Sequence, residues 1–470
     1  MKIVLTHAYF LSLDPKEKAI MKPYPPLGLL YISAWLDKFG MDNEVYDATF
    51  SDPNSQRQYL LKVHPDIIAI YANLMSKIML ADLISFIRSE NIFDQTLIVL
   101  GGPDVTYNIE NYLSLGADVL VIGEGEETML EIAISYEGKS KAQFHHIDGI
   151  AFVDEKEGVT KTRARQKMPD LDLLPSPNRS KIDMSLYLDT WKKHHGKSAI
   201  SISTQRGCPY TCKWCSTAVY GQSYRRRSPA TVAGEMEFIQ KHYNPDQLWF
   251  VDDVFTVSHK WLNDFQLELR ARNIHIPFEC ITRADRLTLD VINVLKDAGC
   301  FRVWIGAESG SQKILDAMDR RVDISHVQEM IMQAKKMGIE TGTFIMLGYP
   351  GETESDIKLT LNYLKSANPD YFTITVAYPI KGTPLYIETE SSQIKKNFWA
   401  GSTDRDIDFK RTYQRSYYNY AVRWVVNSVK LHKLYLSDDD YGMNGWKPRF
   451  KILGARLGMY LTKSKMPKIS

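Results

Sequence analysis

The amino-acid sequence predicts an α/β protein with two successive parallel-sheet domains and a mainly helical carboxyl-terminal region. Three observations lead to this prediction. Short β-rich runs alternate with helical stretches as far as Tyr378, which is typical of parallel strands joined by helices. A charged, proline-containing stretch interrupts that alternation once, and from Phe398 the composition shifts to Tyr, Trp and basic residues. We therefore expect a first domain at 1–149, a linker at 150–198, a second domain at 199–390 and a helical region at 391–470.

Length and composition set the class of protein. With 470 residues the chain exceeds the usual single-domain size, and its formal charge of +2 provides no general attraction to nucleic acid. Five cysteines without a paired framework argue against a disulfide-stapled secreted protein and favour a reducing compartment, so we expect a cytoplasmic location. The segment 1–13 is too interrupted for a signal sequence, and no apolar run has membrane-spanning length.

The first domain is expected to be a doubly wound, flavodoxin-like parallel sheet. In such sheets ligands bind beyond the carboxyl ends of the strands, where this sequence places proline- and glycine-containing loops. For each loop alone, ordinary turn chemistry is the simpler interpretation, but together they favour a ligand crevice. The expected strands are 3–6, 44–47, 67–71, 97–100 and 119–122. The candidate binding residues are Pro26, Gly28, Gly101, Gly102, Gly123 and Gly125.

The second domain is expected to contain six βα units, which suit a partial (β/α)6 barrel of the TIM type. Its functional residues should lie at the carboxyl ends of the strands. The expected strands are 199–204, 247–251, 277–281, 303–305, 342–347 and 371–376.

A CxxxCxxC loop formed by Cys208, Cys212 and Cys215 follows the first strand of the second domain. Three thiolates on one loop can hold three corners of a 4Fe-4S cluster and leave one iron open to another ligand. A zinc site would need a fourth protein ligand, and the nearby His194 and His195 precede the strand rather than follow the loop. Three structural thiols are the plainest alternative, yet three of only five cysteines fall within eight positions.

Polar residues and glycines follow the later strands of the second domain. Carboxylates suit an ammonium group and hydroxyls, an arginine suits a carboxylate, and glycines suit a flat base. A ligand with an amino-acid end, a ribose and an adenine would need all of these. A helix-capping role is an equal alternative for Glu352 and Asp356. The favoured candidates are Asp253 and Glu308, and Arg283 and Gly348 complete the candidate set.

The cysteine loop, an Asp-Asp turn, the strand end GAESG and the loop GYPGET occur in an order that resembles the radical S-adenosylmethionine enzymes. The first domain, with its segments PPLGLLYISAWL, GGP and GEGEET, is similar to the cobalamin-binding domain of one branch of that superfamily. Together the two resemblances span roughly the first four fifths of the chain.

The resemblance implies a role for each matching residue. The three cysteines would ligate the cluster, whose open iron is chelated by S-adenosylmethionine, and reduction would release a deoxyadenosyl radical that removes hydrogen from an unreactive carbon. Trp214 would contact the adenine through its backbone, and the strand ending at Gly348 would flank it. Asp253 would face the methionine ammonium, Glu308 the ribose and Arg283 the carboxylate.

Cobalamin is expected to bind without a histidine ligand from the protein. The Asp-x-His-x-x-Gly loop that supplies such a ligand is absent from residues 8–14, and His7 lacks its spacing. Loss of the cofactor from a retained fold is the alternative.

Methylation of an unactivated carbon in a small metabolite, a lipid or a natural-product precursor is the expected reaction. The alternative is an oxidative cyclisation or rearrangement without methyl transfer, and a non-catalytic iron-sulfur electron-transfer module is a further alternative. A transfer-RNA methylthiotransferase would carry a second cysteine cluster, whereas no cysteine precedes Cys208. The expected partners are a small-molecule or lipid substrate and a flavodoxin- or ferredoxin-type electron donor, with no nucleic acid.

Several smaller features also lead to expectations. Cys280 is expected to be a small buried residue, and Cys300 to precede its strand. The run Arg225 to Arg227 is expected to be a solvated face, with anchoring of the cysteine loop as the alternative. The basic tail at 446–470, which contains no acidic residue, suggests either contact with an anionic membrane or simple solubility.

Overall fold

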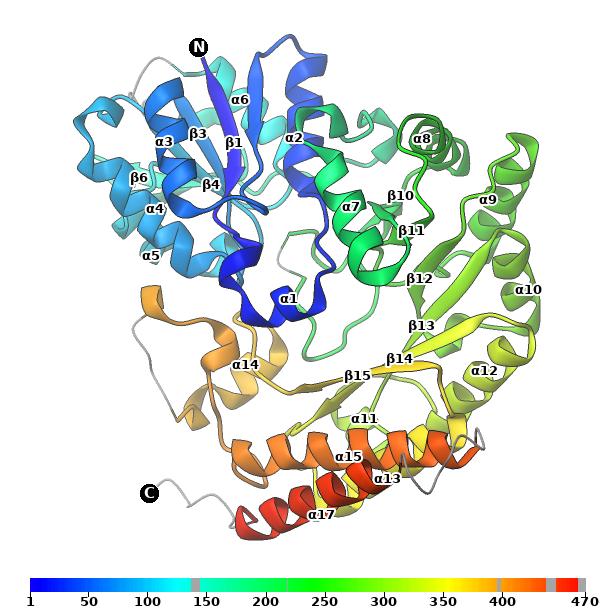
Figure 1. Cartoon of the computed structure of the whole chain (residues 1–470). Coiled ribbons are helices and arrows are strands. Elements are labelled where there is room, and N and C mark those ends of the chain that lie inside the picture. The colour runs from blue at the N-terminus through cyan, green and yellow to red at the C-terminus, as the bar shows by residue number, and fades with distance from the viewer. Residues whose placement is uncertain (137–143, 218, 395–398, 437–444, 464–470) are drawn as a thin grey trace. The chain divides into compact units, whose positions relative to one another are not determined.

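The computed structural model describes residues 1–136, 144–217, 219–394, 399–436 and 445–463 (Figure 1). The chain divides into two compact units. The first unit comprises Met1–Pro209, Thr217–Trp249 and Asn397–Thr403, and the second comprises Tyr210–Ser216, Phe250–Lys396 and Asp404–Ser470.

The first unit is built on a seven-stranded sheet with the strand order β2-β1-β3-β4-β5-β6-β7. The first five strands pair in parallel, which confirms the predicted doubly wound sheet. These strands are β1 (Ile3–His7), β2 (Asn43–Tyr46), β3 (Ile67–Tyr71), β4 (Leu97–Gly101) and β5 (Val119–Val121). Two antiparallel strands, β6 (Ile150–Asp154) and β7 (Gly158–Lys161), extend the sheet into residues expected as linker. The apolar start of β6 and the positive φ of Gly158 explain this hairpin.

Helices cover both faces of the first sheet. Because successive strand residues point to opposite faces, Ile3 and Leu5 join the core beneath α2 and α6, whereas Val4 joins the core beneath α3, α4 and α5. The helices of this unit are α1 (Pro15–Ile20), α2 (Leu27–Lys38), α3 (Pro53–Val63), α4 (Lys77–Ser89), α5 (Ile109–Ser114), α6 (Glu126–Ile134), α7 (Met184–His195) and α8 (Pro229–His242).

A six-stranded sheet with the order β15-β14-β13-β12-β11-β8 confirms the predicted partial barrel. Its strands are β8 (Ala199–Ile202), β11 (Gln247–Phe250), β12 (Phe278–Thr282), β13 (Cys300–Glu308), β14 (Glu340–Leu347) and β15 (Tyr371–Val376). The intervening helices are α9 (His259–Ala271), α10 (Leu289–Asp297), α11 (Gln312–Ala317), α12 (Ile324–Lys336) and α13 (Glu354–Ala367). The expectation that Cys300 precedes its strand is wrong, because Cys300 is the first residue of β13 and pairs with Phe278.

Two short strands, β9 (Gln205–Arg206) and β10 (Arg225–Arg226), pair in antiparallel fashion. The carboxyl-terminal region is mainly helical, as predicted, with α14 (Pro384–Thr389), α15 (Arg415–Leu436) and α17 (Trp446–Leu461). Helix α17 lies beside α15 in the second unit (Figure 1). Among the described residues, no helix is both long and apolar enough to cross a membrane.

Candidate functional site

The segment Tyr210–Ser216, which carries two of the three loop cysteines, is tied to the second unit by hydrogen bonds. The Lys213 N–H donates to the Met318 carbonyl at 3.1 Å, and the Leu385 N–H donates to the Lys213 carbonyl at 2.9 Å. The Thr211 hydroxyl donates to Asp319 at 2.7 Å. The position of the loop is therefore set by residues more than a hundred positions away in the sequence.

Trp214 is half-buried and packs against a small apolar cluster. The cluster comprises Ile314, Met318, Tyr349 and Leu385, with Met346 beside it. This packing holds the loop immediately before Cys215. Backbone contact of Trp214 with an adenine stays a prediction.

Two guanidinium groups lie beside Cys212. Arg283 Nη1 is 3.8 Å and Arg320 Nη1 is 3.7 Å from Cys212 Sγ. Arg283 is buried, donates from Nη2 to the Arg320 carbonyl at 2.9 Å and lies over the Tyr210 ring, 3.9 Å from its centroid. Arg320 is fixed by donation from Nη2 to the Gly306 carbonyl at 2.9 Å. The two guanidinium groups therefore place positive charge and N–H donors beside the Cys212 sulfur.

Arg283 was expected from the sequence to bind a carboxylate, and the structure places it next to a cysteine thiol. Arg320 was not identified from the sequence. It belongs to an Asp-Arg-Arg run in which Asp319 and Arg321 have positive φ values, and no sequence motif signals that conformation.

Glu308 ends β13 with φ +66°, an uncommon value for a residue with a side chain. The pairing of β13 with β14 shifts register between Gly306 and Glu308, which accounts for the local distortion. Desolvation raises the pKa of Glu308 above its usual value, and Arg320 and Arg283 partly offset the rise. Backbone strain at a strand end beside two arginines supports a binding role for this carboxylate.

Asp253 lies just beyond β11. Desolvation by the surrounding protein, and then the neighbouring Asp252 carboxylate, raise the pKa of Asp253 even though the residue stays exposed. A carboxylate in such surroundings gains from a cationic ligand such as an ammonium group. Its role toward S-adenosylmethionine stays a prediction.

Gly348 follows β14 with φ +82°, and its N–H donates to Glu352 Oε2 at 2.5 Å. Glu352 is fully buried, and desolvation raises its pKa to about 8. Because Thr353 is the N-cap residue of α13 and Glu352 instead accepts the Gly348 N–H, a helix-capping role is wrong for Glu352. For Asp356 the capping role is confirmed, because Asp356 and Thr353 form a reciprocal capping box at the start of α13.

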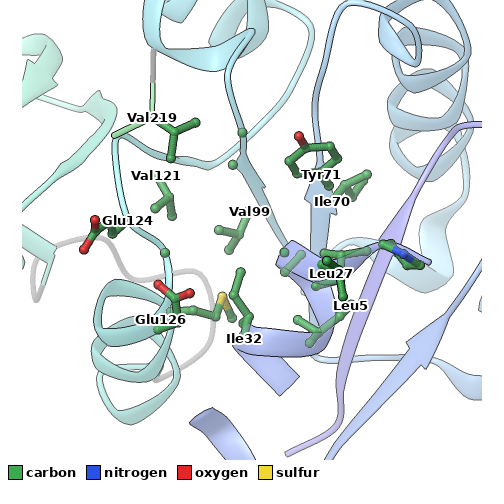
Figure 2. A pocket seen from close by; sticks show the side chains of 18 of the residues that line it. Leu5, Leu27, Ile32, Ile70, Tyr71, Val99, Val121, Glu124, Glu126 and Val219 are labelled. Carbon is green, nitrogen blue, oxygen red and sulfur yellow. The ribbon is translucent and has the colours of Figure 1, made fainter. Parts of the chain in front are cut away.

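A cavity of about 420 Å³ lies in the first unit at the strand ends (Figure 2). The structure brings all six loop residues named from the sequence into its lining, although they come from three separate segments: Pro26, Gly28, Gly101, Gly102, Gly123 and Gly125. Gly102 has φ +120°, and a Cβ atom there would lie 2.4 Å from the Ala72 carbonyl oxygen. Only glycine fits this position without moving the backbone.

The walls of the cavity are mainly apolar. Figure 2 shows Ile32, Val99 and Val121 around a common space, with the carboxylates of Glu124 and Glu126 at one side. Glycine loops at the strand ends let a flat ring system approach the backbone, and the apolar walls suit an aromatic group. The lining residues therefore fit part of a cobalamin molecule.

Among the residues that the structure describes, no histidine lines the cavity. His7 Nδ1 accepts from the Tyr9 N–H at 3.1 Å, so His7 Nε2 carries the proton that it donates to Asp47 Oδ1 at 3.0 Å. Both ring nitrogens are engaged within the fold. Binding of cobalamin without a histidine ligand from the protein stays a prediction.

A buried ion network borders the cavity. Arg206 forms an ion pair with Glu126 and lies 3.6 Å from Glu124, which in turn pairs with Arg225. Although burial alone would lower the pKa of Arg206, the Glu126 carboxylate raises it above its usual value. The network connects the GEGEET loop with strands β9 and β10, and β9 ends two residues before Cys208.

The arginine run Arg225 to Arg227 is not the solvated face that was expected. Arg227 is buried and forms an ion pair with Glu235. Arg179 completes this cluster at 2.7 Å from Glu235 Oε1. The sequence of the run does not reveal this burial, because the acidic partners Glu124 and Glu235 lie in a distant loop and in helix α8.

The three loop cysteines fall in different units, Cys208 in the first and Cys212 and Cys215 in the second. Within the described ranges, no three His, Cys, Asp or Glu side chains are grouped as a metal site. Cluster ligation by the three thiols stays a prediction, supported by their spacing and by the two arginines at Cys212. Cys280 and Cys300 are both buried, with their Sγ atoms 4.0 Å apart.

Comparisons with known proteins support both the cysteine-loop domain and the domain that holds the cavity. Residues 202–364 match the model of the Radical SAM superfamily, and residues 20–133 match that of the B12 binding domain. An uncharacterized methyltransferase of Pyrococcus horikoshii is 30% identical over 82% of this chain and 82% of its own length. An anaerobic magnesium-protoporphyrin IX monomethyl ester cyclase of Cereibacter sphaeroides is 25% identical over 83% of this chain and 63% of its own length.

A solved structure extends the comparison to the fold. The radical S-adenosylmethionine methyltransferase TsrM of Kitasatospora setae, with cobalamin and a [4Fe-4S] cluster bound, superposes with a TM-score of 0.68. It is 18% identical to this chain, and the match covers 83% of this chain and 78% of TsrM.

Proposed function

This chain belongs to the cobalamin-dependent radical S-adenosylmethionine methyltransferase family, and from that premise we propose that it methylates an unactivated carbon of a small molecule or lipid. Membership implies a 4Fe-4S cluster, S-adenosylmethionine and cobalamin as its cofactors. The observation that carries the proposal is the cavity of the first unit, into which six residues from three loops converge. A cofactor pocket of this kind would be unnecessary in a plain electron-transfer module.

The residues of the chain would act by binding and positioning. When bound, the cofactors supply an oxidant that removes a hydrogen atom and a carrier for a methyl group. Cys208, Cys212 and Cys215 would hold the cluster, with Arg283 and Arg320 keeping positive charge beside Cys212. The protein around the cluster and the cobalamin would keep water away from the substrate radical.

The second set of contacts concerns S-adenosylmethionine. Asp253 and Glu308 carry carboxylates whose raised pKa values reflect desolvation, so a cationic or hydrogen-bonding ligand would favour their ionised forms. They would meet the ammonium and ribose groups, and Gly348 would flank the adenine.

The test is an anaerobic reconstitution with iron, sulfide and cobalamin, followed by S-adenosylmethionine with a deuterated methyl group and a low-potential reductant. Formation of 5′-deoxyadenosine by the wild-type chain, and its loss in Cys212→Ala, is the expected result. The matched control is Cys300→Ala, which removes a buried thiol outside the loop. A full cluster without any 5′-deoxyadenosine would refute the radical mechanism.

The same assay, run with candidate substrates, separates methylation from cyclisation. Methylation converts S-adenosylmethionine into both S-adenosylhomocysteine and 5′-deoxyadenosine and gives a deuterated product. Cyclisation converts S-adenosylmethionine into 5′-deoxyadenosine only, and its product carries no deuterium. The cyclase remains the second candidate because of the similarity to the Cereibacter sphaeroides enzyme.

The proposal also includes the partners and the setting of the enzyme. A flavodoxin- or ferredoxin-type protein would deliver the electron to the cluster. The five cysteines, none of which forms a disulfide, support a reducing setting such as the cytoplasm. Contact of the basic carboxyl-terminal region with a membrane is part of the same proposal.

A further inference from the structure

Helix α17 exposes a continuous stripe of large apolar side chains. At 100° per residue these positions fall within an arc of about 100° on the helix surface. Each of the six is between 51% and 77% exposed. They are Trp446, Phe450, Leu453, Leu457, Tyr460 and Leu461.

The opposite face of α17 carries small or compact residues and packs toward α15. Pro448, Ala455, Gly458 and Met459 are buried. A Cβ atom at Gly458 would lie 2.4 Å from Tyr420 Cδ1, so the two helices approach closely there. An ordinary surface helix buries its large apolar residues and exposes its polar ones. Helix α17 reverses that arrangement, so its exposed stripe is not needed for folding.

Basic residues border the stripe on both sides. By the same helical spacing, Lys447 and Lys451 follow one edge, and Arg449, Arg456 and Lys463 follow the other. All five are exposed, and the span 446–463 contains no acidic residue. Lys463 also pairs with Glu354 of α13 at 2.6 Å. The other four cations add positive charge along the two edges of the stripe.

We propose that α17 is an in-plane anchor that docks this enzyme on the interface of an anionic lipid bilayer. The apolar stripe would enter the boundary between headgroups and acyl chains, and the flanking cations would meet lipid phosphates. The charge of the surface favours this occupant over a second copy of the chain, because two copies facing each other would oppose like charges. The docking does not depend on the reaction, and it gives the expected membrane contact a defined surface in α17.

The test uses the full-length protein and flotation with lipid vesicles. The wild-type chain is expected to float with phosphatidylcholine vesicles that contain about a third phosphatidylglycerol, and to bind pure phosphatidylcholine vesicles more weakly. The triple variant Phe450→Ser, Leu453→Ser, Leu457→Ser should bind the anionic vesicles at least about tenfold more weakly, because it removes apolar area that enters the bilayer. Higher salt should weaken binding by the wild type.

The matched control replaces three exposed apolar residues on other helices, Leu267→Ser, Leu289→Ser and Met332→Ser. This variant should bind vesicles as the wild type does, and both triple variants should keep the wild-type melting temperature. Full vesicle binding by the α17 variant would overturn the proposal. So would a lipid-free dimer, seen by light scattering, that the α17 variant abolishes, since the stripe would then be an interface between copies.

Discussion

Replacement of Arg206 by methionine tests the buried ion network of the first unit. The side chains of Arg206 and Glu126 are only 8% and 7% exposed, so Arg206→Met leaves a buried carboxylate without its partner. Glu124 loses its 3.6 Å contact with Arg206 but keeps its pair with Arg225, so the main loss falls on Glu126. Breaking a buried pair by removing one partner costs about 3–5 kcal/mol of unfolding free energy. Methionine retains most of the side-chain volume, so little of this loss comes from a cavity.

Urea denaturation, followed by circular dichroism, measures the loss. The matched control is Arg163→Met, which removes an 83% exposed arginine paired with Asp148 and should change the unfolding free energy little, because solvent screens exposed ion pairs. The double variant Arg206→Met, Glu126→Met should recover most of the stability, because an apolar pair replaces the lone charge. Equal small losses in Arg206→Met and Arg163→Met, or no recovery in the double variant, would refute the reasoning.

Three further predictions concern the cofactor sites and the GYPGET loop. Arg320→Met removes a guanidinium 3.7 Å from Cys212 Sγ and should lower the reduction potential of the cluster by roughly tens of millivolts, measured by redox titration. The pKa of Glu352 is about 8 when folded and 4.5 in the reference state, so stability should fall as pH rises from 5 to 9, and Glu352→Gln should flatten this dependence of the melting temperature. Gly102→Ala should reduce cobalamin retention, measured by absorbance, at least about tenfold, whereas Gly158→Ala, at a positive φ in open space, should not.

The sequence was sufficient to locate the cavity of the first unit. Alternation of strands and helices predicts a parallel sheet, and parallel strands bring their carboxyl ends to one edge. Loops that follow successive strands must therefore meet, which is why Gly101, Gly102, Gly123 and Gly125 line one space. The need for glycine at position 102 was likewise signalled locally, by its place in a tight loop directly after β4.

The arginines could not be assigned in the same way. Arg320 meets Cys212 across 108 positions, and Arg206 meets Glu126 across 80. A run of arginines does not show whether carboxylates elsewhere in the chain will pair with it inside the fold. Arg227 was therefore expected in solvent, whereas the structure buries it beside Glu235. Ion pairs between distant segments depend on how elements pack, and no local pattern records that packing.

The glycine loops of the first unit and the cysteine loop therefore depend on different parts of the sequence. We expect them to respond differently to mutation. The glycine loops are fixed by local backbone conformation, so substitutions far from the cavity should seldom alter cofactor retention. The segment Tyr210–Ser216 is fixed by hydrogen bonds to the Met318 carbonyl and from the Leu385 N–H, and it is contacted by Arg283 just beyond β12 and by Arg320 beyond α11. Substitutions far from the cysteines in sequence should therefore disturb the cluster. A Thr211→Val variant, which loses only the bond to Asp319, should raise the sensitivity of a reconstituted cluster to oxygen while leaving cobalamin retention unchanged.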